Sequence, residues 1–300
     1  MQPTDRMTEP NPVDPRPRPG EKDLLRDALR DPADRGRTKS DIVLLSVQRL
    51  LRRGAITNLA KMLGRMHQAD VAKVIVHLSS SKEKREVFEL VRGESKRGQV
   101  LSELDSDSIN QVLADLLPSD IAWLIKDLGP DDVAYILGVL PEERATEILS
   151  LMRTEDSTEV ADLLKYPKDT AGGIMTTEFF ALPEEATAQD AIRRLQLATD
   201  AEMVFYIYVT DRDERLVGVL SLRQLLTVPP STPLKNIATR DVISVTVDMD
   251  QEEVARQVAS YNLLAIPVID KDNKLVGIIT VDDVVDVIRE EATEDMLKMA

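Results

Sequence analysis

The sequence lacks several residue types on which common functions depend. Among 300 residues there is no cysteine, and there are two histidines, His67 and His77. The absence of cysteine excludes a disulfide framework and a thiolate zinc site, and two histidines leave little material for imidazole chemistry. Hard cations that bind through oxygen, such as Mg²⁺ or Ca²⁺, remain compatible with this composition.

Long apolar runs are also missing. No run approaches the roughly 18 apolar residues of a membrane span, and the N-terminus lacks the apolar core of a signal peptide. The net charge of −15 disfavours nucleic acid as a partner and favours cations or basic surfaces. The sequence also lacks a nucleophile–base pair, a glycine-rich phosphate loop and a metal-plus-base motif, so we expect a cytoplasmic protein that is not an enzyme.

The sequence divides into regions of different composition. Residues 1–38 contain seven prolines and few large apolar residues, which predicts a flexible tail. From residue 39 to residue 167 the apolar residues recur at helical spacing, which predicts an all-helical domain. The remaining residues alternate between strand and helix patterns, which predicts an α/β region at 168–288 and the start of a further helix at 289–300.

A short repeat within the helical domain gives its architecture. The units begin at Pro118-Ser119-Asp120, Pro130-Asp131-Asp132 and Pro141-Glu142-Glu143. Proline and acidic residues suit the first turn of a helix, where amides are unpaired and the dipole favours negative charge. Helices this short cannot bury a face alone, so we expect them to stack into a superhelix. Trp123 and Tyr135 hold equivalent positions and are predicted to pack between units.

A longer repeat occupies the α/β region. Strand patterns at 204–209 and 216–220 reappear at 264–269 and 275–279, and Gly218 and Gly277 are 59 residues apart. An amphipathic helix precedes each pair of strands, at 188–197 and at 252–261. The repeat predicts two β-α-β-β-α units in tandem, at 168–230 and 231–288.

An acidic stretch closes the sequence. Seven of the fourteen residues from 282 to 295 are carboxylates. On a helix they form a stripe, and an apolar side opposite it is expected to be packed: the stripe holds Asp283, Asp286, Glu290 and Glu294, and the apolar side Val285, Ile288, Ala292, Met296 and Met299. Carboxylates at this spacing repel one another, so the stripe favours a cation, although a solvated acidic face is the alternative.

The tandem repeat resembles a pair of CBS domains. The resemblance rests on Pro267-Val268-Ile269-Asp270 and on the run Gly277-Ile278-Ile279-Thr280-Val281-Asp282-Asp283. It implies that Thr280 and Asp283 could hold the phosphate and ribose of ATP or another adenine nucleotide. In the first copy Ser221 and Arg223 are the corresponding candidates, and Gln224 stands where the ribose-binding carboxylate is expected.

The sequence from about residue 40 to its last residue resembles the cytosolic part of MgtE-type magnesium transporters. The resemblance rests on Ala171-Gly172-Gly173-Ile174-Met175-Thr176, on the Pro-Asp-Asp-Val-Ala repeat and on Glu291-Ala292-Thr293-Glu294-Asp295. It implies a helical N domain, a CBS pair and the start of a helix that leads to a membrane domain. It also implies a homodimer formed through the CBS domains, at the cytoplasmic face of the inner membrane if a membrane domain is attached.

The same resemblance implies a set of Mg²⁺ ligands. In that family ions lie between the N domain and the CBS domains and near the connecting helix, and they favour a closed state. The matching positions here are Asp131, Asp250, Glu252, Asp283, Asp286, Glu291, Glu294 and Asp295.

Three functions therefore stay open at this point. The first is a Mg²⁺-sensing regulatory module, and the second is an adenine-nucleotide sensor built on the CBS pair. The third is a scaffold, because the stacked short helices also resemble the middle domain of a flagellar motor switch protein that binds other proteins. The predicted fold is the same for all three: an all-α superhelical N domain followed by an α/β CBS pair.

Overall fold

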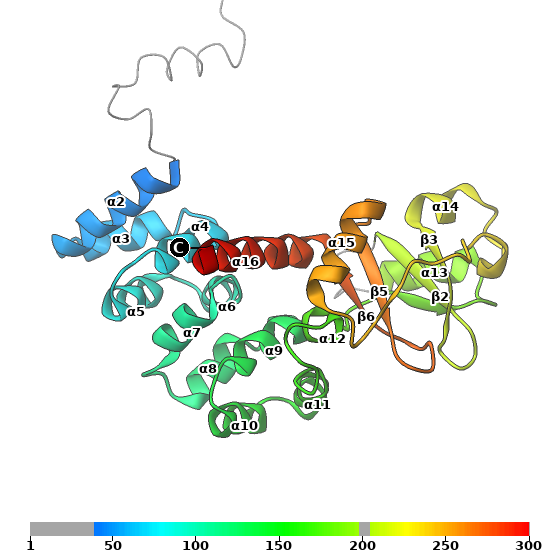
Figure 1. Ribbon diagram of the computed structural model, residues 1–300, viewed down its shortest axis with the longest axis horizontal. Helices are drawn as coiled ribbons and strands as arrows, with labels where there is room; N and C mark the ends of the chain where they lie inside the picture. The colour runs from blue at the N-terminus through cyan, green and yellow to red at the C-terminus, as the bar shows by residue number, and fades with distance from the viewer. Residues whose placement is uncertain (1–38, 198–204, 300) are drawn as a thin grey trace, which may run out of the picture.

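The computed structural model describes residues 39–197 and 205–299, with the backbone alone for residues 39, 40, 290 and 292–299. The predicted tail at 1–38 lies outside the described residues. The helical domain forms an arc (Figure 1). Its helices are α2 (Lys39–Arg52), α3 (Ile56–Leu63), α4 (Gln68–Val76), α5 (Ser81–Leu90), α6 (Glu94–Ser102), α7 (Ser106–Leu113), α8 (Pro118–Leu124), α9 (Pro130–Gly138), α10 (Glu142–Leu151) and α11 (Thr154–Leu163).

The short helices begin and stack as the repeat predicts. Pro118 and Pro130 are the first residues of α8 and α9, and Pro141 directly precedes α10. Each of several helices packs on the helix two positions later: α4 on α6, α5 on α7, α8 on α10 and α9 on α11. This stacking buries one continuous core that includes Leu59, Phe88 and Ile136, and it confirms the predicted superhelical domain.

Basic side chains join neighbouring layers of the arc. Lys96 Nζ on α6 donates to the carbonyl oxygens of Leu63, at 3.0 Å, and Met66, at 2.5 Å. Arg144 on α10 donates in the same way to the carbonyls of Leu113 and Leu116, at 2.6 Å each. The last carbonyls of a helix have no partner within the helix, so these contacts satisfy the ends of α3 and α7.

The second half of the chain contains two small sheets of three strands, ordered β1-β2-β3 and β4-β5-β6. In each sheet the first strand runs parallel to the second, and the second and third form an antiparallel hairpin. The elements are α12 (Ala171–Ile174), β1 (Ala181–Pro183), α13 (Ala188–Leu197), β2 (Tyr206–Thr210), β3 (Leu216–Ser221), α14 (Leu222–Thr227), the 3-10 helix η2 (Leu234–Asn236), β4 (Val245–Thr246), α15 (Gln251–Tyr261), β5 (Ala265–Ile269), β6 (Leu275–Thr280) and α16 (Val281–Met299).

The two hairpins repeat each other in detail. Gly218 lies opposite Val209 in the first, and Gly277 lies opposite Val268 in the second. Each register shifts once, after Val209 and after Val268. The predicted tandem of β-α-β-β-α units is confirmed, and its two copies form separate cores below their own helices.

Residues 169–178, which follow the helical domain and precede β1, are bonded to the second α/β unit. The amides of Ala171 and Gly172 donate to the carbonyls of Met249, at 2.7 Å, and Val247, at 2.9 Å. Thr176 exchanges two backbone hydrogen bonds with Ile278 on β6, at 2.8 and 2.9 Å. Because the buried side chains of this segment also enter the core of the second unit, the N domain is anchored there.

Two expectations about side chains were wrong. On α16 the side chains of Val284 and Val287 are buried, whereas Val285 and Ile288, predicted to be packed, are exposed. The reason is the direction in which α16 leaves β6. Contacts described below fix the first turn of α16, and this turn directs Val284 and Val287 into the core of the second unit. The second wrong expectation concerns Trp123, which was predicted to pack between repeats and is 44% exposed. Tyr135, for which the same was predicted, does pack, and its hydroxyl donates to the carbonyl of Leu104 at 3.2 Å.

Candidate functional site

A cavity of about 1190 Å³ lies between the N domain and the second CBS unit. Helices α4, α6, α9, α10 and α11 line one side, and the first turns of α16 line the other. In Figure 1 α16 runs from the CBS pair towards α4 and α6, along the inside of the arc. The cavity therefore joins residues that are more than two hundred positions apart in the sequence, such as Lys73 and Asp286.

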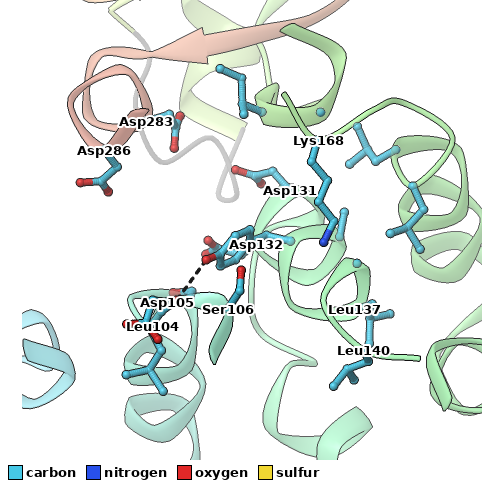
Figure 2. Close-up of a pocket in the computed structure, with 18 of the residues that line it drawn as sticks. Leu104, Asp105, Ser106, Asp131, Asp132, Leu137, Leu140, Lys168, Asp283 and Asp286 are labelled. Atoms are coloured by element: carbon cyan, nitrogen blue, oxygen red, sulfur yellow. Dashed lines mark hydrogen bonds between the residues drawn. The ribbon is translucent and has the colours of Figure 1, made fainter. Parts of the chain in front are cut away.

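Carboxylates from both sides face this cavity. Asp131 and Asp132 come from α9, Glu103 follows α6, and Asp283 and Asp286 come from α16. Figure 2 shows Asp283 and Asp286 on one helix and Asp131 and Asp132 across from them. The predicted ligands Asp131, Asp283 and Asp286 thus line one cavity.

The start of α9 explains the position of Asp131 and Asp132. Both lie in the first turn, after Pro130, where a carboxylate interacts favourably with the helix dipole. Gly129 immediately precedes the helix, and a Cβ atom there would lie 2.8 Å from Asp131 Oδ1. Glycine at this position therefore lets the carboxylate of Asp131 turn back over the helix start.

The start of α16 fixes Asp283 in a similar way. Its Oδ2 atom accepts a hydrogen bond from Thr280 Oγ1 at 2.5 Å and a longer one from the Thr280 amide at 3.4 Å. A carboxylate three residues after the start that bonds back to it is a common helix cap. The cap holds Asp283 at the edge of the cavity, and it sets the rotation of α16 that buries Val284 and Val287.

Burial beside like charges perturbs these groups. Burial, followed by the charges of Asp131 and Asp283, raises the pKa of Asp132 to about 7. Burial likewise raises the pKa of Asp283 to about 7 despite the hydrogen bonds from Thr280, with Asp282 and Asp131 adding to the effect. The cavity thus brings carboxylates close enough together to disfavour one another's ionisation.

Glu103 and the basic side chains of Lys73, Lys168 and Arg289 also line the cavity. Burial raises the pKa of Glu103, and so does the charge of Asp286, while His67 and Lys73 lower it. Lys168 extends into the cavity in Figure 2, and burial lowers the pKa of its ammonium group. Asp286 also accepts a hydrogen bond from Arg289 at 2.9 Å, so the α16 side carries both signs of charge.

A second acidic group lies where α15 begins beside α16. Asp250 caps α15 by accepting from the amides of Glu252, at 2.9 Å, and Glu253, at 3.3 Å. The pKa of Glu252 is raised, chiefly by the charge of Glu291, which itself accepts from Gln251 at 3.2 Å. The structure thus brings together the predicted ligands Asp250, Glu252 and Glu291.

Two further predicted ligands, Glu294 and Asp295, lie on α16. The structure describes only the backbone at these two positions. Among the side chains that the structure describes, no three from His, Cys, Asp or Glu lie close enough together to form a ready-made metal site. The acidic groups are therefore arranged around a space and do not converge on one point.

The candidate nucleotide residues occupy equivalent places in the two CBS units. Thr280 and Asp283 end β6 and begin α16, and Ser221 and Arg223 end β3 and begin α14. In the first unit Gln224 takes the position of Asp283. Its side-chain Oε1 accepts a hydrogen bond from the backbone amide of Ser221 at 2.7 Å, and its backbone amide donates to Ser221 Oγ at 3.3 Å. Arg223 is exposed.

Sequence reasoning missed Asp132 and Glu103 as part of this site. A signal for Asp132 was present, since it shares the first helical turn with Asp131. Glu103 follows α6 without any motif, and only the stacking of α6 on α9 brings it to the cavity.

Comparison with known proteins gives this cavity a context. Residues 66–169 match the MgtE intracellular N domain, and residues 171–231 and 234–290 match CBS domains. A crystal structure of the cytosolic domain of the Mg²⁺ channel MgtE in complex with ATP is similar with a TM-score of 0.71 and 36% identity, over 81% of this chain and 99% of that one. This chain belongs to the MgtE family.

Further relatives of the MgtE family agree with this. The soluble part of a magnesium transporter is similar with a TM-score of 0.67 and 31% identity, over 85% of this chain and 100% of that one. The magnesium transporter MgtE of Thermus thermophilus is 48% identical over 136 residues, which is 45% of this chain. That of Enterococcus faecalis is 45% identical over 138 residues, or 46% of this chain.

The chain covers 30% of the length of each of these two MgtE transporters. The described residues have the domain order and fold of the MgtE cytosolic domain, an N domain followed by a CBS pair. No helix among them combines the length and the apolar character that crossing a membrane requires.

Proposed function

We propose that this chain is the Mg²⁺-responsive, non-enzymatic regulatory part of an MgtE-type magnesium transporter. Mg²⁺ binds in the cavity between the N domain and the second CBS unit and favours the closed arrangement of the two. The observation that supports this most directly is that Asp131 and Asp132 face Asp283 across one cavity, with the pKa values of Asp132 and Asp283 raised to about 7.

The chemistry of the ion suits this cavity. Mg²⁺ takes six oxygen ligands, loses its water reluctantly and commonly binds proteins through one or two carboxylates. A space lined by separated carboxylates can hold a hydrated ion through water, which does not require three side chains at ligand distance. The ion replaces repulsion between Asp131, Asp132 and Asp283 with attraction of each to a shared dication.

The proposed response follows from the same charges. Without Mg²⁺, repulsion across the cavity favours a splayed arrangement of the N domain and the CBS pair. An ion that binds the closed arrangement more favourably by about 1.4 kcal/mol shifts the equilibrium about tenfold. Weak sites suffice, and weak affinity lets the protein respond when the concentration of the ion changes.

The other predicted ligands extend the proposal along α16. Asp250, Glu252 and Glu291 form a second candidate site, in which the charge of Glu291 already raises the pKa of Glu252. Asp286 belongs to the first cavity, and we assign Glu294 and Asp295 to the part of α16 nearer a membrane domain.

Asp283→Asn is a sharp test of this proposal. Asparagine removes the charge and retains an oxygen that can accept from Thr280. Without Mg²⁺ we expect a melting temperature equal to or above that of the native chain, because repulsion falls. A ligand at 100 times its Kd stabilises the native state by about 2.7 kcal/mol, and we expect the variant to lose most of that gain.

The melts are compared in Mg²⁺ and in a sodium salt of matched ionic strength, with small-angle scattering to report how compact the chain is. Asp107→Asn is the matched control, since Asp107 lies in the first turn of α7 and outside the cavity. Equal responses of the native chain to the two salts, or of the native chain and the Asp283→Asn variant to Mg²⁺, would reject the proposal.

A second candidate function, binding of an adenine nucleotide by the CBS pair, has support of its own. The cytosolic domain of the Mg²⁺ channel MgtE, to which this chain is similar, was crystallised with ATP. Thr280 supplies a hydroxyl beside the start of α16, which suits a phosphate, and Asp283 supplies a carboxylate that suits ribose hydroxyls. A nucleotide at Asp283 would then compete with, or depend on, the ion in the adjoining cavity.

We also propose that a second copy of the chain covers the helices of the CBS pair. Large apolar side chains are exposed on these helices and at their ends, including Leu226 on α14, Tyr261 on α15 and Ile288 on α16, with 65%, 58% and 49% of their surfaces exposed. Apolar groups gathered on paired helices are typical of an interface. A membrane domain joined to α16 is the further partner that this proposal implies.

Leu226→Asp tests the dimer. A charge placed in an apolar interface is costly, so we expect the variant to sediment as a monomer at concentrations where the native chain is a dimer. Leu151→Asp, at another exposed leucine (53%) on α10 of the N domain, is the control. A native chain that sediments as a monomer at all concentrations would disprove the dimer.

A further inference from the structure

A second pocket, of about 410 Å³, opens on the N domain between α6 and α8. It shares no residue with the lining of the cavity described above. Its lining combines an indole, an acid, a guanidinium group, a hydroxyl and two leucines, which are Trp123, Asp120, Arg97, Ser119, Leu116 and Leu124. The ring of Trp123 is the main apolar surface, and 44% of that residue is exposed.

The groups around this pocket are incompletely satisfied. Arg97 Nε is buried, and within the described part of the chain it has no hydrogen-bond partner. Asp120 is exposed at the first turn of α8. Lys126 Nζ lies 4.6 Å from the centre of the Trp123 ring, which shows that this exposed ring attracts a cation. A fitting occupant therefore supplies an acceptor for Arg97, a cation for Asp120 and a flat apolar surface for the indole.

One segment of this chain supplies all three. Residues 15–19 read Pro-Arg-Pro-Arg-Pro, so Arg16 and Arg18 alternate with prolines. A polyproline II segment makes no internal hydrogen bonds, so its carbonyls are available to donors such as Arg97, and its proline rings pack on aromatic side chains. Arginine pairs with a carboxylate and stacks on an aromatic ring better than the lysine now over Trp123.

We propose that residues 15–19 bind this pocket in the polyproline II conformation. Proline packs against Trp123, Arg16 or Arg18 pairs with Asp120, and a carbonyl of the segment accepts from Arg97 Nε. The pocket thereby gives the proline-rich N-terminal segment a docking place on the N domain, on a surface separate from the ion cavity.

The length of the connection permits this. Lys39, where α2 starts, is twenty positions after residue 19, and an extended chain covers about 3.3 Å per position, or about 66 Å in all. A compact domain of 130 residues has a radius of gyration of about 14 Å, so its width is well below this reach. Because the segment is tethered, its effective concentration at the pocket is in the millimolar range, so weak binding is enough.

Fluorescence tests the proposal in the full chain, because Trp123 is the single tryptophan of the sequence. Acrylamide quenching of its emission reports how open the ring is to solvent. Substituting Pro15→Ala, Pro17→Ala and Pro19→Ala together is expected to raise the quenching constant roughly twofold by freeing the ring from the docked segment. Asp120→Asn is also expected to raise the quenching constant, by a smaller factor.

The matched control replaces three prolines outside the motif, Pro3→Ala, Pro10→Ala and Pro12→Ala, and is expected to leave the quenching constant unchanged. Equal quenching in the native chain and the first variant would overturn the proposal. Protection of Trp123 that disappears on dilution would overturn it as well, because the segment of another copy would then be the occupant. A melting temperature of the variant close to that of the native chain would show that the substitutions leave the fold intact, which separates docking from folding.

Discussion

The two CBS units have the same topology and differ at the turn into their last helix. Both hairpins shift register at the same place, and Glu214 and Asn273 adopt the same left-handed conformation, with φ of 64° and 63°. The caps then diverge, since Ser221 pairs with the neutral Gln224 and Thr280 pairs with Asp283. One residue at a shared position thus gives the second unit a partly buried carboxyl group that the first lacks at that position.

The units also differ in what covers their hairpins. Gly277 lies under the segment that joins the N domain to the CBS pair, and a Cβ there would meet Met175 Sδ at 2.6 Å. Gly218 instead faces a residue of its own unit, since a Cβ there would meet that of Ala238 at 2.8 Å. The repeat preserves the fold, and the second unit carries the contacts to residues 171–176, which follow the N domain.

The largest effect that separates the units is expected from alanine at these glycines. Gly277→Ala and Gly218→Ala each overpack a close contact, which costs about 1–3 kcal/mol of unfolding free energy. Gly277→Ala should also loosen the junction, so limited proteolysis should release the N domain faster. Gly218→Ala should destabilise the first unit and leave that cleavage rate as it is in the native chain. Equal cleavage of both variants would contradict the anchoring of the N domain on the second unit.

The second-largest effect that distinguishes the two CBS units is expected in a pH series without divalent ions. Asp132 and Asp283 have native pKa values of about 7, above the 3.8 of an ordinary aspartate, so the folded state binds more protons between these values. Stability that protonation contributes is therefore present at low pH and is lost as the pH rises through about 7. Asp131, Asp282 and Glu103 face these groups and strengthen the effect.

Thermal melts in a chelating buffer between about pH 5 and about pH 8 measure this slope. The Asp132→Asn and Asp283→Asn variants should show a smaller loss of melting temperature with rising pH than the native chain. Gln224→Asn, at the neutral cap of the first unit, should keep the native slope. A native slope in all three variants would show that the cavity carboxylates do not titrate as we expect.

The smallest effect is expected from making the first unit resemble the second. Gln224→Asp places a carboxylate at the position that Asp283 holds, and one hydrogen bond to a ribose hydroxyl contributes about 0.5–1.5 kcal/mol. Titration calorimetry should then show ATP binding strengthened roughly twofold to tenfold. Gln224→Asn keeps a neutral amide and should leave the affinity unchanged. Absence of ATP binding in the native chain and in both variants would contradict the second candidate function.

Much of the fold could be predicted from local patterns. Pro118 and Pro130 mark helix starts because proline suits the first turn, and the recurrence of Gly218 as Gly277 reveals the tandem units. These signals depend on neighbours in the sequence. The same holds for Asp131 and Asp283, whose positions near helix starts were visible before the structure.

Features that depend on distant contacts could not be predicted. Glu103 reaches the cavity because α6 packs on α9, and no motif near Glu103 announces that contact. The buried side of α16 depends on the cap at Thr280 and on the sheet beneath, so the simple helical stripe missed that Val284 and Val287 are the side chains buried within the chain, while Val285 and Ile288 are exposed on it. Whether the predicted ligands bind an ion stays a prediction.

The docking of residues 169–178 on the second CBS unit has a consequence for synthesis. On the ribosome this segment emerges long before β6, its partner through Thr176 and Ile278. Synthesis at about 5–20 residues per second separates the two by about 5–20 seconds. Ala171 and Met175, fully or almost fully buried in the finished protein, have no core to enter in that interval. The N domain and the first CBS unit are thus made in order, but the joint between the N domain and the CBS pair closes last.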